Sequence, residues 1–227
     1  MSPTRIELAG LTTVVVEPRP ASETVPTVVL LHGFGAPGDD LVSLAQAIDV
    51  PARFVFPAAP LALGGLYGDA RAWWHLDLAR LEDELRRGIP RDRRDEVPDG
   101  LVTVRTQLLR FLDELAGRFP VSRLVLGGFS QGAMLALDVA LHRATPPAGL
   151  LLMSGTLIAA SEWQPRLATL QSVPVLQSHG RADTLLPFSI AEVLRDQLRA
   201  AGAVVDWHPF GGGHEIPRGA LEAVGRL

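Results

Sequence analysis

Apolar and β-branched residues form short runs along the chain, and these runs alternate with longer stretches in which apolar residues recur every three or four positions. The short runs predict buried strands and the longer stretches predict amphipathic helices. Strands are expected at about residues 12–16, 27–31, 53–56, 123–127, 149–153, 173–177 and 204–209. Helices are expected at about residues 40–48, 101–118, 131–142, 187–200 and 217–226. Strands that alternate with helices predict an α/β fold with a mostly parallel central sheet and helices on both of its faces.

No repeat, low-complexity tract or linker divides this pattern, and 227 residues suit one domain, so residues 1–227 are expected to form a single domain. The first ten residues alternate polar and apolar side chains and lack the apolar stretch of a signal peptide. The apolar runs elsewhere are too short to cross a bilayer. A cytoplasmic location is therefore expected, and the sequence leaves open whether the chain forms a homodimer.

The amino-acid composition excludes several kinds of catalytic and metal-binding site. The chain has no cysteine, and all 21 of its basic residues are arginine. Disulfides, thiolate metal sites, a cysteine nucleophile and a Schiff-base lysine are therefore excluded. The net charge of -4 and the lack of a basic amphipathic stretch indicate neither a nucleic-acid partner nor a membrane-surface partner. No cluster of metal ligands stands out, so no metal site is expected.

One segment differs in character from the rest. Between residues 80 and 96 charged residues of both signs predominate, and Gly88-Ile89-Pro90 interrupts them. The segment is either a solvated surface excursion or a mobile cap that borders the active site, since loops of this kind can gate entry to such sites. We place the excursion at about residues 76–98 and expect no large separate cap domain.

The segment Gly128-Phe129-Ser130-Gln131-Gly132 matches the pattern G-x-S-x-G in the setting that this pattern requires. A buried strand precedes it and a helix follows, as in a nucleophile elbow, where a sharp turn exposes the serine hydroxyl. Side chains at Gly128 and Gly132 would collide with the neighbouring strand and helix. The following helix also directs its N-terminal amides toward charge that develops beside the serine. Ser130 is therefore the candidate nucleophile.

A serine hydroxyl needs a positioned base, and in this architecture the base follows the nucleophile on a loop, with an acid between the two in chain order. His214 follows three glycines, after the last strand and before the last helix. His179 is the competitor, but it precedes the candidate acid. Asp183 lies just past a strand end, where catalytic groups gather in open α/β sheets. We take His214 as the base and Asp183 as the acid; Glu162, in a presumed loop, is the alternative acid.

Two backbone N–H groups are needed to stabilise the oxyanion of an acyl-transfer transition state. One belongs to the residue after the nucleophile, Gln131, and the other to an early strand–helix loop. The glycine-rich loop at residues 32–40 follows an apolar strand and allows a close backbone approach. We take the N–H of Phe34 as the second donor.

The chain resembles the phospholipase/carboxylesterase family, which includes the acyl-protein thioesterases. The resemblance extends from about residue 28 to 216 and rests on six blocks in order: LLHGFGAPGDD, FPAAP, RAWWHLD, LGGFSQGAMLALDVAL, HGRADTLLP and GGGHEIP. It implies an α/β-hydrolase fold, a triad of Ser130, His214 and Asp183, and oxyanion amides on Phe34 and Gln131. It also implies hydrolysis of carboxylic esters with short to medium acyl chains, with no cofactor.

The resemblance further implies that Trp73 and Leu185 line the acyl pocket. The block RAWWHLD departs from related sequences in its second tryptophan and its histidine, and the excursion is longer than in the thioesterases, so the natural substrate stays open. Adjacent tryptophans on an extended segment point to opposite sides. One of Trp73 and Trp74 is therefore expected in the core while the other floors a cleft.

Other functions remain to be weighed against an esterase acting on a small-molecule ester. A thioesterase or lysophospholipase would use the same triad, and the sequence does not separate these. A serine peptidase often adds a separate domain that screens peptides, for which this chain has little room. A non-catalytic binding module is expected to have lost a triad residue or the surrounding glycines, and all of these are present.

Overall fold

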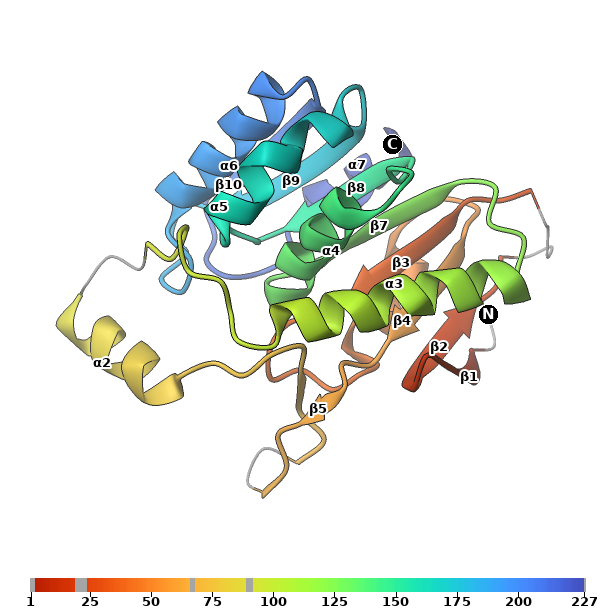
Figure 1. Cartoon of the computed structure of the whole chain (residues 1–227), viewed down its shortest axis with the longest axis horizontal. Coiled ribbons are helices and arrows are strands. Elements are labelled where there is room, and N and C mark those ends of the chain that lie inside the picture. Colours follow the sequence, from red (N-terminus) through yellow and green to blue (C-terminus); the bar gives the residue numbers. More distant parts are fainter. Residues whose placement is uncertain (1–2, 19–23, 66–67, 89–91, 227) are drawn as a thin grey trace.

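The computed structural model describes residues 3–18, 24–65, 68–88 and 92–226. Its centre is an eight-stranded sheet with the strand order β1-β2-β4-β3-β7-β8-β9-β10 (Figure 1). Strand β2 runs antiparallel to both neighbours, whereas every neighbouring pair from β4 to β10 is parallel. The strands are β1 (Thr4–Leu8), β2 (Leu11–Val16), β3 (Thr27–Leu31), β4 (Arg53–Pro57), β7 (Leu124–Phe129), β8 (Gly149–Met153), β9 (Pro174–Gly180) and β10 (Val204–Phe210). The predicted α/β-hydrolase fold, with a mostly parallel sheet, is confirmed.

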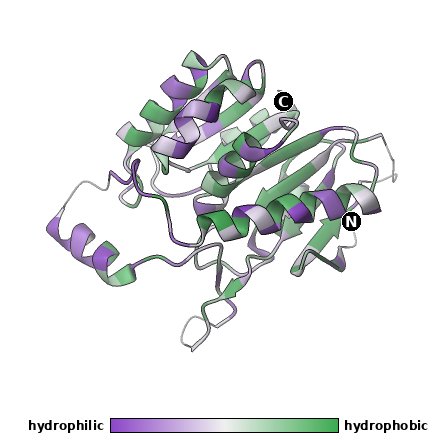
Figure 2. Ribbon diagram, in the orientation of Figure 1, coloured by the Kyte–Doolittle hydropathy of each residue, from purple (hydrophilic) through white to green (hydrophobic). Residues whose placement is uncertain are grey.

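Helices cover both faces of the sheet, and each face has its own apolar core. Strand β3 shows the division, because Val29 and Leu31 pack into one core while Val28 and Leu30 pack into the other. Figure 2 shows the central strands as the most hydrophobic part of the fold. The first face carries α3 (Leu101–Arg118), α4 (Gln131–His142), α5 (Ala160–Trp163), η3 (Gln164–Leu170) and α6 (Phe188–Ala200). The second carries η1 (Asp40–Ser43), α1 (Leu44–Ala47), α7 (Arg218–Ala223) and η4 (Val224–Arg226).

Two of these elements differ from the sequence expectation. Strand β1 was not predicted; only its last residue, Leu8, is buried, so its pattern carries little hydrophobic signal. The expected helix at 40–48 divides into the 3₁₀ turn η1 and the short α1. Ile48 ends α1 in an extended conformation, and Pro51 follows closely and cannot continue a helix.

The charged excursion leaves the body of the protein after a short hairpin of β5 (Leu61–Ala62) and β6 (Arg71–Ala72). It forms α2 (Leu78–Arg87), a helix that the sequence analysis did not predict and that stands apart from the sheet (Figure 1). Residues 89 and 90 of the Gly-Ile-Pro interruption, and Arg91, lie outside the described residues. Among the residues that are described, no helix is long and apolar enough to cross a bilayer.

Candidate active site

Ser130 is the single residue between the end of β7 and the start of α4, and it lies in a strained turn. Its φ of 53° and ψ of -117° belong to a region that non-glycine residues rarely adopt. Its N–H donates to the carbonyl of Met153 on β8, 2.9 Å away. A Cβ at Gly128 would lie 2.4 Å from the carbonyl oxygen of Leu31, and one at Gly132 only 2.0 Å from it. Both glycines are therefore required for the turn to pack against β3, as the sequence predicted.

The structure brings Ser130, His214 and Asp183 together in one line of hydrogen bonds. The Nε2 of His214 lies 2.8 Å from the Oγ of Ser130, and its Nδ1 lies 2.7 Å from the Oδ2 of Asp183. The Asp183 side chain is fully buried, and that of His214 is 15% exposed. The three side chains come from loops that follow β7, β9 and β10, so they meet at one edge of the parallel sheet.

The two loops that carry the histidine and the acid are bonded to each other. Ala182 donates its N–H to the carbonyl of Gly212 at 3.0 Å, and a Cβ at Gly180 would lie 2.1 Å from the carbonyl oxygen of Gly213. The glycines before His214 therefore permit a close backbone approach as well as a flexible turn. The ring of His214 also packs on Phe129, with 4.9 Å between ring centroids.

Asp183 is held as a buried carboxylate. Its Oδ1 accepts the N–H groups of Leu185 at 2.8 Å and Leu186 at 2.9 Å, while Oδ2 faces His214. Burial alone would raise the pKa of Asp183, but the hydrogen bonds from His214 and Leu186 outweigh it and hold that pKa below its ordinary value. The acid therefore stays ionised and can stabilise a positive charge on the neighbouring imidazole.

The loop after β3 brings the second predicted oxyanion donor, Phe34, to the wall of the cavity at Ser130. Within the described ranges, the N–H groups of Phe34 and Gln131 have no backbone carbonyl as partner. His32 fixes this loop, because its Nδ1 donates to the carbonyl of Gly33 at 2.8 Å and its Nε2 accepts the N–H of Ala59 at 3.0 Å. Burial lowers the pKa of His32, which keeps the ring in this neutral, one-donor state. Two free amides thus point to a site for a developing oxyanion.

The side chain of Gln131 ties the turn to the segment that carries both tryptophans. Its Oε1 accepts the N–H of Trp73 and its Nε2 donates to the carbonyl of Trp74, each at 2.9 Å. The indole N–H of Trp73 donates to the carbonyl of His32, also at 2.9 Å. Trp73 is therefore held in the core, in contact with the loop after β3 that carries His32.

A cavity of about 380 Å³ opens beside Ser130 and His214. Leu185 lines it, as predicted, but among the described residues that form its wall the tryptophan is Trp74 and not Trp73. The assignment of Trp73 to the acyl pocket is thus corrected: its side chain faces the other way, into contact with His32. The rest of the wall includes apolar side chains from the excursion and from the body, among them Leu76, Leu81, Val97, Met134 and Ile158.

The sequence analysis missed three features of this site. It did not assign a role to His32, although the residue stands in the loop block that carried the family resemblance. It used only the backbone of Gln131 and not its side chain. It also left the direction of the two tryptophans to the family resemblance, and the strand alternation that it noted cannot say which of them faces the cavity.

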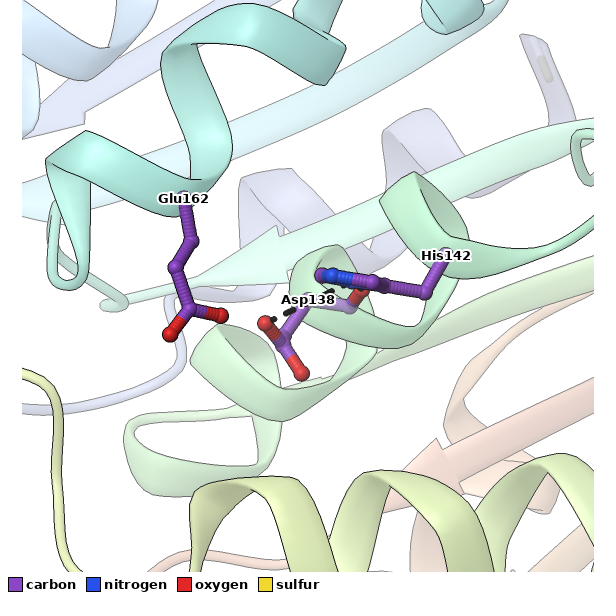
Figure 3. A group of neighbouring side chains, drawn as sticks. All are labelled: Asp138, His142 and Glu162. Atoms are coloured by element: carbon purple, nitrogen blue, oxygen red, sulfur yellow. Dashed lines mark hydrogen bonds and ion pairs between the residues drawn. The ribbon is translucent and has the colours of Figure 1, made fainter.

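A second group of titratable side chains lies on α4 and α5, away from the cavity. Figure 3 shows Asp138, His142 and Glu162 close together, a set that could in principle hold a metal ion. Arg105, however, contacts the two oxygens of Asp138 at 2.6 and 2.9 Å and Glu162 at 2.7 Å. Trp163 donates to Asp138 as well, at 2.8 Å.

One fixed guanidinium already pairs with both carboxylates. Burial alone would lower the pKa of Arg105, but its bonds to Asp138 and Glu162 raise that pKa above its ordinary value. We therefore assign the group a structural role in joining α3, α4 and α5. Glu162 belongs to this ion pair and to a helix, not to a loop, so it is not available as the acid for His214.

The sequence of this chain is similar to the sequences of known hydrolases. The sequence model of the Phospholipase/Carboxylesterase family matches residues 12–226. Acyl-protein thioesterase 1 of Neurospora crassa is 26% identical over 210 residues, which cover 87% of this chain and 83% of the relative. Acyl-protein thioesterase 1 of Mycosarcoma maydis is 27% identical over 219 residues, with 89% of each chain covered.

Solved structures give the same picture. Esterase PE8 superposes with a TM-score of 0.77 at 29% identity and covers 93% of this chain and 94% of its own. The carboxylesterase of Bacillus cereus gives a TM-score of 0.71 over 95% of this chain and 92% of its own, and at 22% identity that likeness concerns the fold alone.

Proposed function

The chain belongs to the phospholipase/carboxylesterase family of serine hydrolases, and from that premise we propose that it is a carboxylesterase that cleaves esters of short to medium acyl chains through an acyl-serine intermediate. The single observation that carries the proposal is the continuous line of hydrogen bonds from Ser130 through His214 to Asp183. Ser130 serves as nucleophile, His214 as general base and Asp183 as the acid that orients the base.

The reaction runs in two halves. His214 Nε2 takes the proton of Ser130 as its Oγ attacks the ester carbonyl, and the oxyanion is stabilised by the N–H groups of Phe34 and Gln131. The bond to the leaving alcohol then breaks, and His214 returns the proton to that oxygen. Water then attacks the acyl-serine carbonyl while His214 takes its proton. His214 returns that proton to the Oγ of Ser130 as the acyl–oxygen bond breaks, which releases the carboxylic acid and free Ser130.

We propose that the cavity beside Ser130 holds the acyl chain. Apolar side chains that suit a hydrocarbon form much of its wall, among them Trp74 and Leu185. The excursion contributes residues 76, 81 and 97 to the same wall, which supports its role as a cap that borders the substrate.

A thioester is the second candidate substrate, because the curated relatives reported above are acyl-protein thioesterases. A lysophospholipid is the other alternative that the sequence leaves open. The same triad would act on either. Turnover therefore has to be compared across p-nitrophenyl esters of increasing chain length, a palmitoyl thioester and a lysophospholipid. Highest kcat/KM on short to medium p-nitrophenyl esters supports the esterase proposal, whereas highest kcat/KM on the thioester or the lysophospholipid replaces it.

The nucleophile is tested by covalent labelling. An organophosphonate probe should add one phosphonyl group, mapped to the peptide that contains Ser130. Ser130→Ala should abolish labelling and lower kcat by roughly a million-fold. Retained turnover in clean Ser130→Ala protein contradicts the assignment.

A further inference from the structure

A second histidine, His179, lies beside the proposed acid, Asp183. His179 belongs to β9, and its side chain is fully buried. Its Nε2 makes a hydrogen bond of 2.9 Å to the carbonyl of Leu186 and lies 3.3 Å from the Oδ2 of Asp183. That is the same carboxylate oxygen that faces His214 Nδ1. Two imidazoles therefore share one oxygen of the acid.

The surroundings of His179 determine the charge of its ring and which ring nitrogen carries the proton. Burial lowers the pKa of His179, and this effect outweighs the Leu186 carbonyl and the Asp183 carboxylate, which both favour the charged ring. The charged or titratable groups that act on the ring are Asp183 and His214. The ring is therefore neutral at neutral pH. The backbone of Gly155 also favours the charged ring. We assign the proton to Nε2, because that nitrogen lies beside the Leu186 carbonyl and the Asp183 carboxylate, whereas Nδ1 has no hydrogen-bond partner among the described residues.

His179 closes a small ring of hydrogen bonds around the acid. It donates to the carbonyl of Leu186, and the N–H of Leu186 donates to the Oδ1 of Asp183. Leu185 N–H donates to the same Oδ1, and Leu185 and Leu186 both line the cavity. The side chains of Asp183 and His179 thus both hold the short turn from 183 to 186.

We propose that His179 is a positioning residue for the triad: by holding Leu186 and lying beside Oδ2, it fixes the direction in which the Asp183 carboxylate meets His214. The inference rests on the proposed function of Asp183 and adds a residue to it. His179 itself cannot serve as the base for Ser130, because its Nε2 is occupied by Leu186 and its side chain has no exposed surface.

The test compares two substitutions at this position. His179→Leu replaces the imidazole with an apolar side chain of similar size and so removes the N–H donor. His179→Gln instead keeps an N–H donor at about the distance that Nε2 reaches. Active sites are counted by phosphonate labelling, so that kcat is expressed per competent Ser130. Loss of the hydrogen-bond partner of a metal ligand typically costs about 10–100-fold in activity, and we expect a similar factor for the partner of a catalytic carboxylate. His179→Leu should therefore lower kcat per site by roughly that factor, with little change in KM, and His179→Gln should recover most of it.

The pH profile separates positioning from simple stability. In His179→Leu the acid limb of kcat/KM should move to lower pH, because a displaced carboxylate stabilises the protonated form of the base less well. If kcat per labelled site and the acid limb both match the parent, and only the melting temperature or the number of labelled sites falls, the positioning role is overturned. Failure of the parent protein to label at Ser130 would instead overturn the proposed function itself.

Discussion

The Nε2 of Gln131 donates to the carbonyl oxygen of Trp74 across 2.9 Å, which links the residue after the proposed nucleophile to the wall of the acyl cavity. The side chain of Gln131 is buried, so this bond is shielded from water. The position of the cavity wall relative to Ser130 is thereby set by one amide side chain. Besides the oxyanion role that we propose for its backbone N–H, Gln131 thus holds the cavity wall through its side chain.

Gln131→Met should keep the backbone N–H and remove both side-chain bonds. Leaving buried polar groups of Trp73 and Trp74 unpaired should cost about 1–3 kcal/mol of unfolding free energy. The wall should also become less well placed, so discrimination between butyrate and octanoate esters should weaken. Denaturant unfolding and a kcat/KM series measure the two effects.

Gln107→Met is a matched control, because Gln107 also donates to a backbone carbonyl, that of Ala9 at 3.1 Å, and does not line the cavity. It should lose stability without any change in chain-length preference. Equal preference in Gln131→Met and the parent would mean that the wall does not depend on this bond.

Trp74→Ala should enlarge the acyl cavity and move the optimum toward longer chains. Each further buried methylene contributes up to about 0.8 kcal/mol, so selectivity should shift roughly two- to fourfold per added carbon. Both indoles are buried, so each substitution should destabilise the fold, Trp73→Ala by about 3–5 kcal/mol. Trp73→Ala should be the more destabilising of the two, because it also removes the bond to the His32 carbonyl, and it should leave the chain-length preference unchanged. Ester panels and unfolding curves distinguish the pair, and a chain-length shift in Trp73→Ala alone would reverse the assignment.

Asp183→Asn should leave the fold intact and lower kcat by roughly ten-thousand-fold, because the amide favours the wrong tautomer of His214. Steady-state kinetics on a p-nitrophenyl ester provide the measurement. Glu162→Gln is the control, since Glu162 pairs with Arg105 and should matter for stability only. Near-parental turnover in Asp183→Asn would show that another group orients the base.

The sequence predicts the order of elements and the chemistry of the triad because both depend on local patterns. A strand, a glycine turn and a helix can be recognised around Ser130, and glycines precede His214. The direction of Trp73 and Trp74 cannot be read in this way, because it is decided by the Gln131 and His32 bonds from distant parts of the chain. The same holds for His179, whose role depends on Leu186 seven residues further on.

Helix α2 was missed for a different reason. Its charges suggested a solvated loop, but several of them pair with one another and with residues that follow the helix. Three of these pairs, Arg80–Glu84, Asp83–Arg86 and Asp83–Arg87, have the i,i+3 or i,i+4 spacing of a helix, so the sequence did carry a helix signal here. Of these pairs, only that of Arg93 with Glu84 becomes visible in the fold alone.

Acidification should destabilise the protein through His32. Its folded pKa lies below its ordinary value because of burial, so the unfolded chain binds the proton more readily. The stability that this residue contributes is present above the unfolded pKa of about 6.5 and is lost as the pH falls below it. Asp40 favours the charged ring and Arg71 opposes it.

The loss of unfolding free energy that protonation of His32 can cause has an upper limit. Between pH 7.5 and 5.5 one such histidine can remove at most about 1.4 kcal/mol of unfolding free energy. Denaturant unfolding at both pH values in the parent and in His32→Gln provides the measurement. The loss on acidification should be smaller in the variant, and an equal loss would remove His32 as its source.

Four residues of the excursion form a closed ring of ion pairs. Arg80 contacts Glu84 and Glu96, each at 2.8 Å. Arg93 contacts the same two carboxylates at 2.7 and 3.2 Å. The ring therefore binds α2 to the segment that returns from it, and three of its members, Arg80, Arg93 and Glu96, lie on the cavity wall. If the excursion is a cap, this ring holds it in place.

Arg93→Met should open the ring at two bonds and loosen the wall on the excursion side. The KM for a long-chain ester should change by roughly two- to fivefold, within the range expected of partly exposed ion pairs, while that for p-nitrophenyl acetate should stay near the parental value. Arg86→Met is the matched control, because Arg86 lies on the same helix and pairs only with Asp83 within the described residues. High salt should reproduce the effect of Arg93→Met in the parent, since screening weakens such pairs. A long-chain KM that neither Arg93→Met nor salt alters, or that Arg86→Met alters as much, would show that the excursion is a surface feature without a part in substrate selection.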